Sequence, residues 1–224
     1  MDVSRPLHGN EGVLAYIRRH ATESMAIAID APLIIPNTNR QRVCETLVGN
    51  RYGARDASCH TSNLTLYPNA ASVRLACELA RDGFCHAPLN SGPRVMLEVY
   101  PHAALVQLFD LKKIIKYKKG TVAMKREGLQ ILQRKLAELP NAEPRLLSSP
   151  SFHAFICADV QNLGGQRLKD YEDAIDGLIC AYLAYYYWRW TCARTEIFGD
   201  VKNGYIVNPS SPLSPSPSLT HHVS

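Results

Sequence analysis

The sequence lacks the short motifs that identify the common nucleotide-binding enzymes. It contains no Gly-x-Gly-x-x-Gly pattern, no phosphate-loop motif and no internal repeat. Its seven cysteines are scattered without a Cys-x-x-Cys spacing, and their number is odd. This usage indicates neither a zinc site nor a disulfide framework, and it predicts reduced thiols in a cytoplasmic protein.

Long apolar segments and strong net charge are also missing. The longest apolar run, from Leu178 to Trp188, is too short to span a bilayer. No basic N-terminal region precedes an apolar core, so a secretory signal is not expected. With 224 residues, 46% of them hydrophobic, and a net charge of only +5, the composition predicts one soluble globular domain without membrane association.

Acidic residues in apolar surroundings are the most informative positive feature. Asp30 and Glu98 each lie in a short, mostly apolar run that is typical of a buried strand, and Asp173 and Asp176 open a long apolar helix. Carboxylates are costly to bury unless they are paired or coordinate a cation, and such oxygen ligands suit Mg²⁺ or Mn²⁺. The pattern predicts that these four acids converge as catalytic metal ligands. Taken singly, each also fits a structural role as a turn or helix cap.

Two basic clusters are candidate phosphate contacts. Residues 112–126 contain seven cations and no acid, and a second cluster contains Arg40, Arg42, Arg51 and Arg55. Such patches attract phosphate groups, although a solvated surface explains a charge run equally well. Cys59 and His60 are adjacent, but adjacency alone does not make a nucleophile and base, so a structural or substrate-contacting role is expected. The predicted substrate contacts are Arg42, Arg55, His60, Asn63, Lys118 and Lys119.

Hydrophobic periodicity predicts helices that alternate with a few strands. The expected helices cover residues 13–20, 41 onward, 70–81, 102–109, 122–139, 151–159 and 167–190. The expected strands cover residues 25–33 and 94–100, followed by a turn and one short strand within 199–207. From Pro209 onward the chain is rich in Ser and Pro, which predicts a disordered tail over residues 209–224.

Six motifs, in order along the chain, resemble the domain of unknown function 429 family. They are Ala-Ile-Asp-Ala-Pro-Leu (28–33), Ser-Cys-His-Thr-Ser-Asn-Leu (58–64), Glu-Val-Tyr-Pro-His (98–102), Lys-Tyr-Lys-Lys-Gly (116–120), Glu-Asp-Ala-Ile-Asp-Gly-Leu-Ile-Cys-Ala-Tyr (172–182) and Gly-Tyr-Ile-Val (204–207). The resemblance extends from about residue 10 to residue 209. Members of this family are predicted nucleases with an RNase H-like fold.

The resemblance implies an α/β fold of three layers with the sheet order 3-2-1-4-5. Asp30 would match the acid of the fourth strand, and Glu98 would lie on the fifth strand. Asp173 and Asp176 resemble an Asp-x-x-Asp pair that supplies further metal ligands. The implied chemistry is the attack of metal-activated water on a phosphodiester, with Mg²⁺ or Mn²⁺ as the cofactor.

The sequence departs from that fold before its first predicted strand. Only 24 residues precede Met25, and a helix occupies part of them, so a three-stranded meander does not fit. The expected RNase H-like domain, residues 1–208, therefore lacks the N-terminal β-meander and its metal-binding Asp. It should be mostly helical with a small sheet of two parallel strands. The strand at residues 25–33 would keep an open apolar edge, which favours self-association.

The expected function is that of a divalent-metal-dependent nuclease acting on phosphodiesters, inactive if the missing strand is required. One alternative is a non-catalytic module that binds nucleic acid or protein through the basic surface. Another is a hydrolase of nucleotide-like small molecules that uses the same acids, because a fold alone does not define a substrate.

Overall fold

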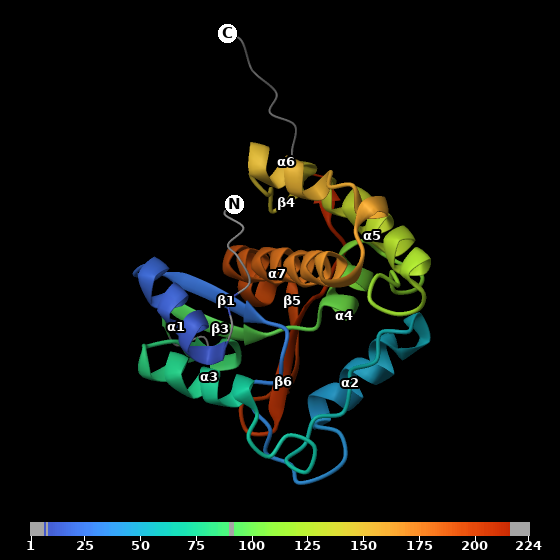
Figure 1. Cartoon of the computed structure of the whole chain (residues 1–224). Coiled ribbons are helices and arrows are strands. Elements are labelled where there is room, and N and C mark those ends of the chain that lie inside the picture. The colour runs from blue at the N-terminus through green and yellow to red at the C-terminus, as the bar shows by residue number, and fades with distance from the viewer. Residues whose placement is uncertain (1–6, 8, 90–91, 216–224) are drawn as a thin grey trace.

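A small parallel sheet lies at the centre of the computed structural model (Figure 1), which describes residue 7 and residues 9–89 and 92–215. Strand β1 (Met25–Ile29) pairs with β3 (Arg94–Glu98), and the short β2 (Cys85–His86) pairs with the other side of β3. All three strands run parallel, and Ile29 lies opposite Glu98 in the register. The predicted α/β class is confirmed, with three parallel strands in place of the two expected.

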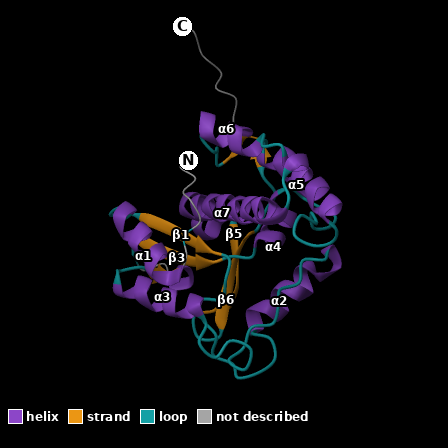
Figure 2. Ribbon diagram, in the orientation of Figure 1, coloured by secondary structure: helices purple, strands orange, loops and turns teal. Residues whose placement is uncertain are grey.

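Helices cover both faces of the sheet (Figure 2). Met96 packs with α1 (Gly9–His20) and α3 (Ala71–Arg81), whereas its neighbour Leu97 packs in the core that includes α7 (Gly165–Trp190). Successive side chains of a strand point to opposite faces, so the almost continuous apolar sequence of β3 is buried on both sides. The result is a three-layer arrangement in which α7 packs directly against β1.

The helices predicted from periodicity are all present. The remaining ones are α2 (Val43–Tyr52), α4 (Pro101–Leu108), α5 (Val122–Leu136) and α6 (Pro150–Ile156). The apolar face of α5, with Leu129 and Leu132 fully buried, joins the same core as α4 and α7. Within the residues that the structure describes, no helix combines the length and apolar character needed to cross a membrane.

A hairpin lies near the C-terminal end, and only its turn and one of its two strands were predicted from the sequence. Strands β5 (Thr195–Asp200) and β6 (Gly204–Pro209) pair antiparallel, and a bridge between Val99 and Val207 places β6 beside the end of β3. The Asp200 carboxylate closes the turn by accepting hydrogen bonds from the backbone N–H groups of residues 202 and 203 at 2.8 and 2.7 Å. Helix α2 packs against this hairpin.

Regular structure extends past the predicted start of the tail. Pro209 is the last residue of β6, and β7 (Ser214–Pro215) pairs antiparallel with β4 (Ala142–Glu143). Ordered structure therefore continues past residue 208, because the chain returns to pair with the segment after α5. The remainder of the predicted tail, residues 216–224, lies outside the described residues.

Gly128 allows α5 to pack closely on the basic segment before it. An added Cβ at this position would overlap the carbonyl oxygen of Lys116 and would lie 2.9 Å from the Cα of Tyr117. Both obstacles are backbone atoms, so they cannot rotate away as a flexible side chain could. Residues 116–118 can therefore follow this path only because Gly128 has no side chain.

We expect Gly128→Ala to destabilise the protein by about 2 kcal/mol, because overpacking outweighs the roughly 1 kcal/mol by which Ala favours a helix. The matched control is Gly177→Ala in α7, where an added Cβ meets nothing within 4 Å, and it should stabilise the protein slightly. Urea denaturation measures both changes. Equal effects of the two substitutions would contradict the close packing at Gly128.

Candidate functional site

A cavity of about 410 Å³ opens at the carboxyl ends of β1 and β3. Asp30 follows the last residue of β1, and Tyr100 follows β3 by two residues; both side chains line the cavity. His60 and Ser72, from the loop before α3 and from α3 itself, line other parts of it. In parallel α/β sheets, ligands bind outside the carboxyl ends of the strands, so this cavity is the candidate functional site.

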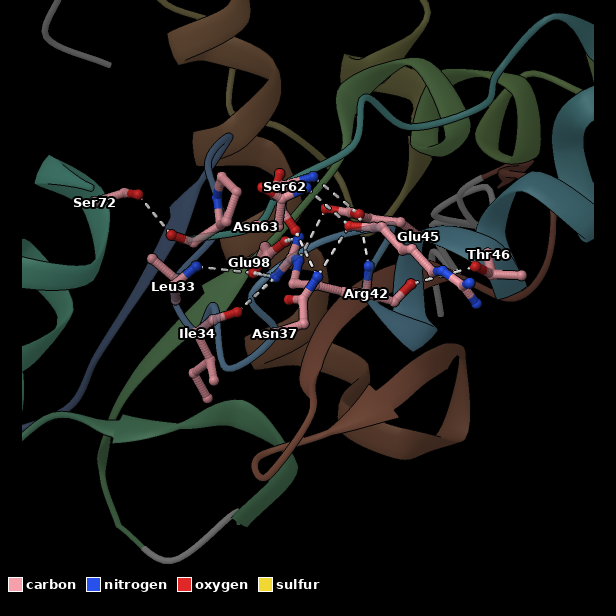
Figure 3. Close-up of polar contacts among 12 residues, drawn as sticks. Leu33, Ile34, Asn37, Arg42, Glu45, Thr46, Ser62, Asn63, Ser72 and Glu98 are labelled. Carbon is pink, nitrogen blue, oxygen red and sulfur yellow. Dashed lines mark hydrogen bonds and ion pairs between the residues drawn. The ribbon is translucent and has the colours of Figure 1, made fainter. Parts of the chain in front are cut away.

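The wall of the cavity contains a buried ion-pair network (Figure 3). The guanidinium of Arg42 donates two hydrogen bonds to Glu98, from Nη1 at 3.0 Å and from Nη2 at 2.6 Å. Its Nε donates a third to Glu45 at 2.9 Å. All three residues are at most 3% exposed. Two parallel bonds between a guanidinium and a carboxylate form one of the strongest side-chain contacts available in proteins.

Backbone groups complete this network. Glu98 also accepts a hydrogen bond from the N–H of Leu33 at 2.9 Å, and Arg42 donates to the carbonyl of Ile34 at 3.0 Å. Glu45 accepts from the N–H of Ser62 at 3.1 Å, as Figure 3 shows. The network therefore ties β3, α2 and two cavity loops to one another.

Burial is the largest influence on the titration of this pair. It raises the pKa of Glu98 to about 7, while the hydrogen bonds and charge of Arg42 oppose the rise. Burial alone would lower the pKa of Arg42, but Glu98 reverses the effect and the pKa lies above its usual value. Both oxygens of Glu98 already accept hydrogen bonds, so in this arrangement Glu98 is not available to a metal ion.

A second charged group forms around Lys118. The Lys118 ammonium contacts Oδ2 of Asp176, and the Tyr117 hydroxyl donates to Oδ1 of the same carboxylate at 2.7 Å. The positive charge of Lys118 also acts on Asp30. Cys180, one helical turn after Asp176, lies near the backbone of Asp30, which places this face of α7 beside the end of β1.

Asp30 combines an exposed side with a largely enclosed environment. The residue is exposed where it lines the cavity, yet the protein packed around its other sides raises the pKa of its carboxyl, and Lys118 opposes that shift. Among the described residues, no hydrogen bond to its carboxylate is formed. Asp30 is therefore the predicted ligand that remains open to a bound molecule.

Asp173 lies away from this group. Its side chain is 53% exposed and pairs with Lys169, one turn earlier on the same helix. The acids that face inward from α7 are instead Asp176 and Glu172, which are four residues apart, and Glu172 pairs with Lys125 at 3.1 Å. Asp173 and Asp176 therefore lie on different sides of the edge of the buried face of α7, so the structure does not bring these two predicted ligands together.

The four predicted ligands do not form a ready metal site. In the part of the chain that the structure describes, no three His, Cys, Asp or Glu side chains lie together in a way that could hold a metal ion. Glu98 is occupied by Arg42, and Asp173 is on the surface. What remains is a pair of carboxylates, Asp30 and Asp176, that share the charge of one lysine.

Some of the predicted substrate contacts line a cavity with an exposed side chain, and others are buried or lie elsewhere. His60 is exposed and lines the cavity, and Lys118 and Lys119 line a smaller cavity beside His102. Arg42 also lines the larger cavity, but it is buried and its guanidinium is engaged in ion pairs, so its role as a phosphate contact stays a prediction. The side chain of Asn63 is also buried; it donates to the carbonyl of Arg40 at 3.1 Å and accepts from the N–H of Leu66 at 2.9 Å. It therefore shapes the loop.

Arg55 is also placed apart from the cavity. Its guanidinium lies 3.8 Å from the carboxylate of the exposed Asp110, and its side chain is 40% exposed. Tyr117 and Tyr100, by contrast, contribute to the site although no sequence pattern singled them out. The only signal was their position inside the motifs at 116–120 and 98–102.

The sequence model of one family matches residues 10–196, most of the chain, and carries the description "Protein of unknown function (DUF429)". The chain belongs to this family. Its membership confirms the resemblance drawn from the six motifs, while the family description assigns no activity. No curated protein and no solved structure matches the chain, so the DUF429 site has to be interpreted from its own residues.

We expect Arg42→Met to destabilise the protein by about 3–5 kcal/mol, because it leaves two buried carboxylates without their cation. The matched control is Arg18→Met, which breaks the Arg18–Asp82 pair, with side chains 53% and 25% exposed. Exposed pairs contribute about 1 kcal/mol at most. Chemical denaturation compares the two, and similar losses would show that the Arg42 network is not the stabilising contact described above.

His102 lines the smaller cavity and packs against Tyr100, which lines the larger one. Its ring centroid is 5.7 Å from that of Tyr100 and 5.5 Å from that of Tyr117, and its Nδ1 atom is buried without a hydrogen-bond partner in the described chain. Burial lowers the pKa of His102 to about 4, and the nearby charges of Lys118, Lys119 and His60 add to the effect. The imidazole is therefore neutral at physiological pH.

This shift predicts a pH dependence of stability. As pH falls below 6.5, the unfolded chain binds a proton at His102, whereas the folded chain does so only near pH 4. The free energy of unfolding should therefore rise with pH across that window, by about 2 kcal/mol from this residue after allowance for its partial exposure. Urea denaturation at several pH values should give a flatter profile for His102→Gln. Parallel profiles would contradict the depressed pKa.

Proposed function

We propose that this chain hydrolyses phosphodiesters and that the reacting centre lies at Asp30 and Asp176. The observations that support this proposal are the contact of Lys118 with Asp176, the electrostatic effect of the same lysine on Asp30, and the place of Asp30 in the wall of a cavity at the carboxyl ends of parallel strands. Asp30 comes from the end of β1 and Asp176 from the middle of α7. The predicted nuclease activity and RNase H-like architecture are part of the same proposal.

The two carboxylates fit Mg²⁺ or Mn²⁺ better than the four predicted from the sequence. Mg²⁺ is usually bound through one or two carboxylates, with substrate phosphates and water completing its shell. Asp176 holds the Lys118 ammonium, whose charge also acts on Asp30, so a metal ion would bind here by displacing this lysine from Asp176. When bound, the ion would lower the pKa of a water molecule and stabilise negative charge on the phosphate.

Each neighbouring side chain has a defined task in this proposal. Tyr117 holds Asp176 in place through its 2.7 Å hydrogen bond, so it is a positioning residue. Lys118 can exchange its contact with Asp176 for a phosphate oxygen of the substrate. The Arg42 network acts at a distance by fixing the loop that follows Asp30.

A nucleotide-like small molecule is the second candidate substrate, and the cavity favours it. Its volume of about 410 Å³ lies in the range of small-molecule sites. In addition, most of the predicted basic surface is engaged within the chain. Four of the seven cations in residues 112–126 bind other residues, namely Lys113, Lys118, Lys125 and Arg126. This reduces the support for a non-catalytic nucleic-acid module.

Binding of nucleic acid, self-association and a cytoplasmic location stay predictions. β1 pairs with β3 on one side, and in the described part of the chain it has no strand partner on the other. Residues 25–29 are only partly buried, so this edge is compatible with the self-association expected from the sequence.

We expect Asp30→Asn and Asp176→Asn to lower kcat/KM roughly 100-fold or more in the presence of Mg²⁺ or Mn²⁺, since each removes a charge that acts directly at the reacting centre. Turnover should be measured with bis(p-nitrophenyl) phosphate, a short oligonucleotide and a dinucleotide. Asp173→Asn is the matched control, because it removes the same group from the exposed side of α7.

The control should retain activity within a factor of about two. A loss in Asp173→Asn equal to that in Asp176→Asn would overturn the assignment of the reacting centre. Absence of turnover with every substrate and both metals would overturn the proposed function. Circular dichroism of each variant separates loss of activity from loss of folding.

A further inference from the structure

A second cavity, of about 220 Å³, lies where the basic segment meets the start of α5. Its polar lining consists of His102 from α4 and Lys116, Lys118 and Lys119 from the segment before α5. Gly120 lines it as well, with a backbone φ of +98° that a residue with a side chain rarely adopts. The cavity can hold several water molecules or one hydrated anion, since a water molecule occupies about 30 Å³.

The charged residues that line this cavity are lysines. Among the described residues no acid lines it, and Lys118 is the one lining lysine with an ion pair, to Asp176. Lys116 and Lys119 are exposed and form no ion pair within the described residues. Like charges held together without a counter-ion repel one another, so a bound anion would relieve an unfavourable interaction.

Two further groups point to an anion. Helix α5 starts at Val122, and at its beginning the Thr121 hydroxyl accepts a hydrogen bond from only one backbone N–H, that of Met124. The other first-turn N–H groups and the helix dipole favour negative charge here. The imidazole of His102 lines the same cavity.

We propose that this cavity is a phosphate-binding subsite formed by Lys116, Lys119, the start of α5 and His102. Lys118 links it to the reacting centre, because this lysine lines the subsite and also contacts Asp176. The natural occupant is a second phosphate of the substrate, adjacent to the phosphodiester that is cleaved. The identity of this occupant rests on the proposed function, whereas the existence of the subsite does not.

The subsite narrows the class of substrate. A molecule that spans both cavities carries at least two phosphates, one in the diester and one on a neighbouring unit. Oligonucleotides and nucleotides with a terminal phosphate satisfy this requirement. An isolated diester with two neutral substituents does not, and it should use the reacting centre alone.

The first test is the binding of inorganic phosphate to the metal-free protein by isothermal titration calorimetry at fixed ionic strength. Lys119→Gln should weaken binding roughly tenfold, because it removes a charge that faces the cavity. Lys112→Gln is the matched control, since this exposed lysine belongs to the same segment but does not line the cavity. It should bind phosphate as the unchanged protein does.

Imidazole NMR provides an independent readout of the same event. Phosphate should shift the His102 ring signals, and the shift should saturate at the concentration found by calorimetry. Equal weakening by both lysine substitutions, or binding that leaves His102 unperturbed, would overturn the subsite.

The second test separates free phosphate from substrate phosphate. In Lys119→Gln, KM should rise for a dinucleotide with a terminal phosphate while kcat changes little, and both constants should be unchanged for bis(p-nitrophenyl) phosphate. Equal effects on the two substrates would overturn the assignment to a substrate phosphate. If neither substrate is turned over, the proposed function fails, and the calorimetric result still decides the subsite.

Discussion

The buried pair of Arg42 and Glu98 is the contact on which the candidate site depends. Removing a charge from water costs several kcal/mol, and only a close partner with well-directed hydrogen bonds offsets that cost. Arg42 meets this condition for two carboxylates at once, at distances of 2.6 to 3.0 Å. Because Glu98 also binds the N–H of Leu33, the loop after Asp30 is fixed to the end of β3.

This constraint divides the acids of the chain into two groups. Glu45 and Glu98 stabilise the structure, and their oxygens are occupied. Asp176 contacts Lys118, and the charge of the same lysine acts on Asp30; in the proposed function, a bound phosphate or cation replaces the lysine contact. The structural and chemical roles of the carboxylates therefore follow from which cation each of them meets, Arg42 or Lys118.

The elements of the fold followed from local sequence patterns to a large extent. Patterns among neighbouring residues were sufficient to predict these elements. Examples are the apolar runs of β1 and β3, the leucine face of α5 and the glycines at the start of α7. β2 is only two residues long, and β5 follows α7 after a single short turn, so neither has a clear pattern of its own. β7 pairs with β4 across a long stretch of sequence.

The site was less predictable because its contacts are distant in sequence. Arg42 and Glu98 are separated by 56 residues, and nothing near either one shows that they pair. The helical acids posed a related difficulty. Glu172, Asp173 and Asp176 fall within about one turn and a half, and only the packing of α7 decides that Asp173 is the one on the surface.

A crystal structure with bound Mn²⁺ would show directly whether Asp30 and Asp176 hold a metal ion. Anomalous scattering locates the ion without reference to activity or to any variant. We expect a peak between the carboxylates of Asp30 and Asp176, with the Lys118 ammonium moved away from Asp176 and the pair of Arg42 and Glu98 unchanged. A peak at Glu98 or Asp173, or none at Asp30 and Asp176 under saturating Mn²⁺, would contradict it.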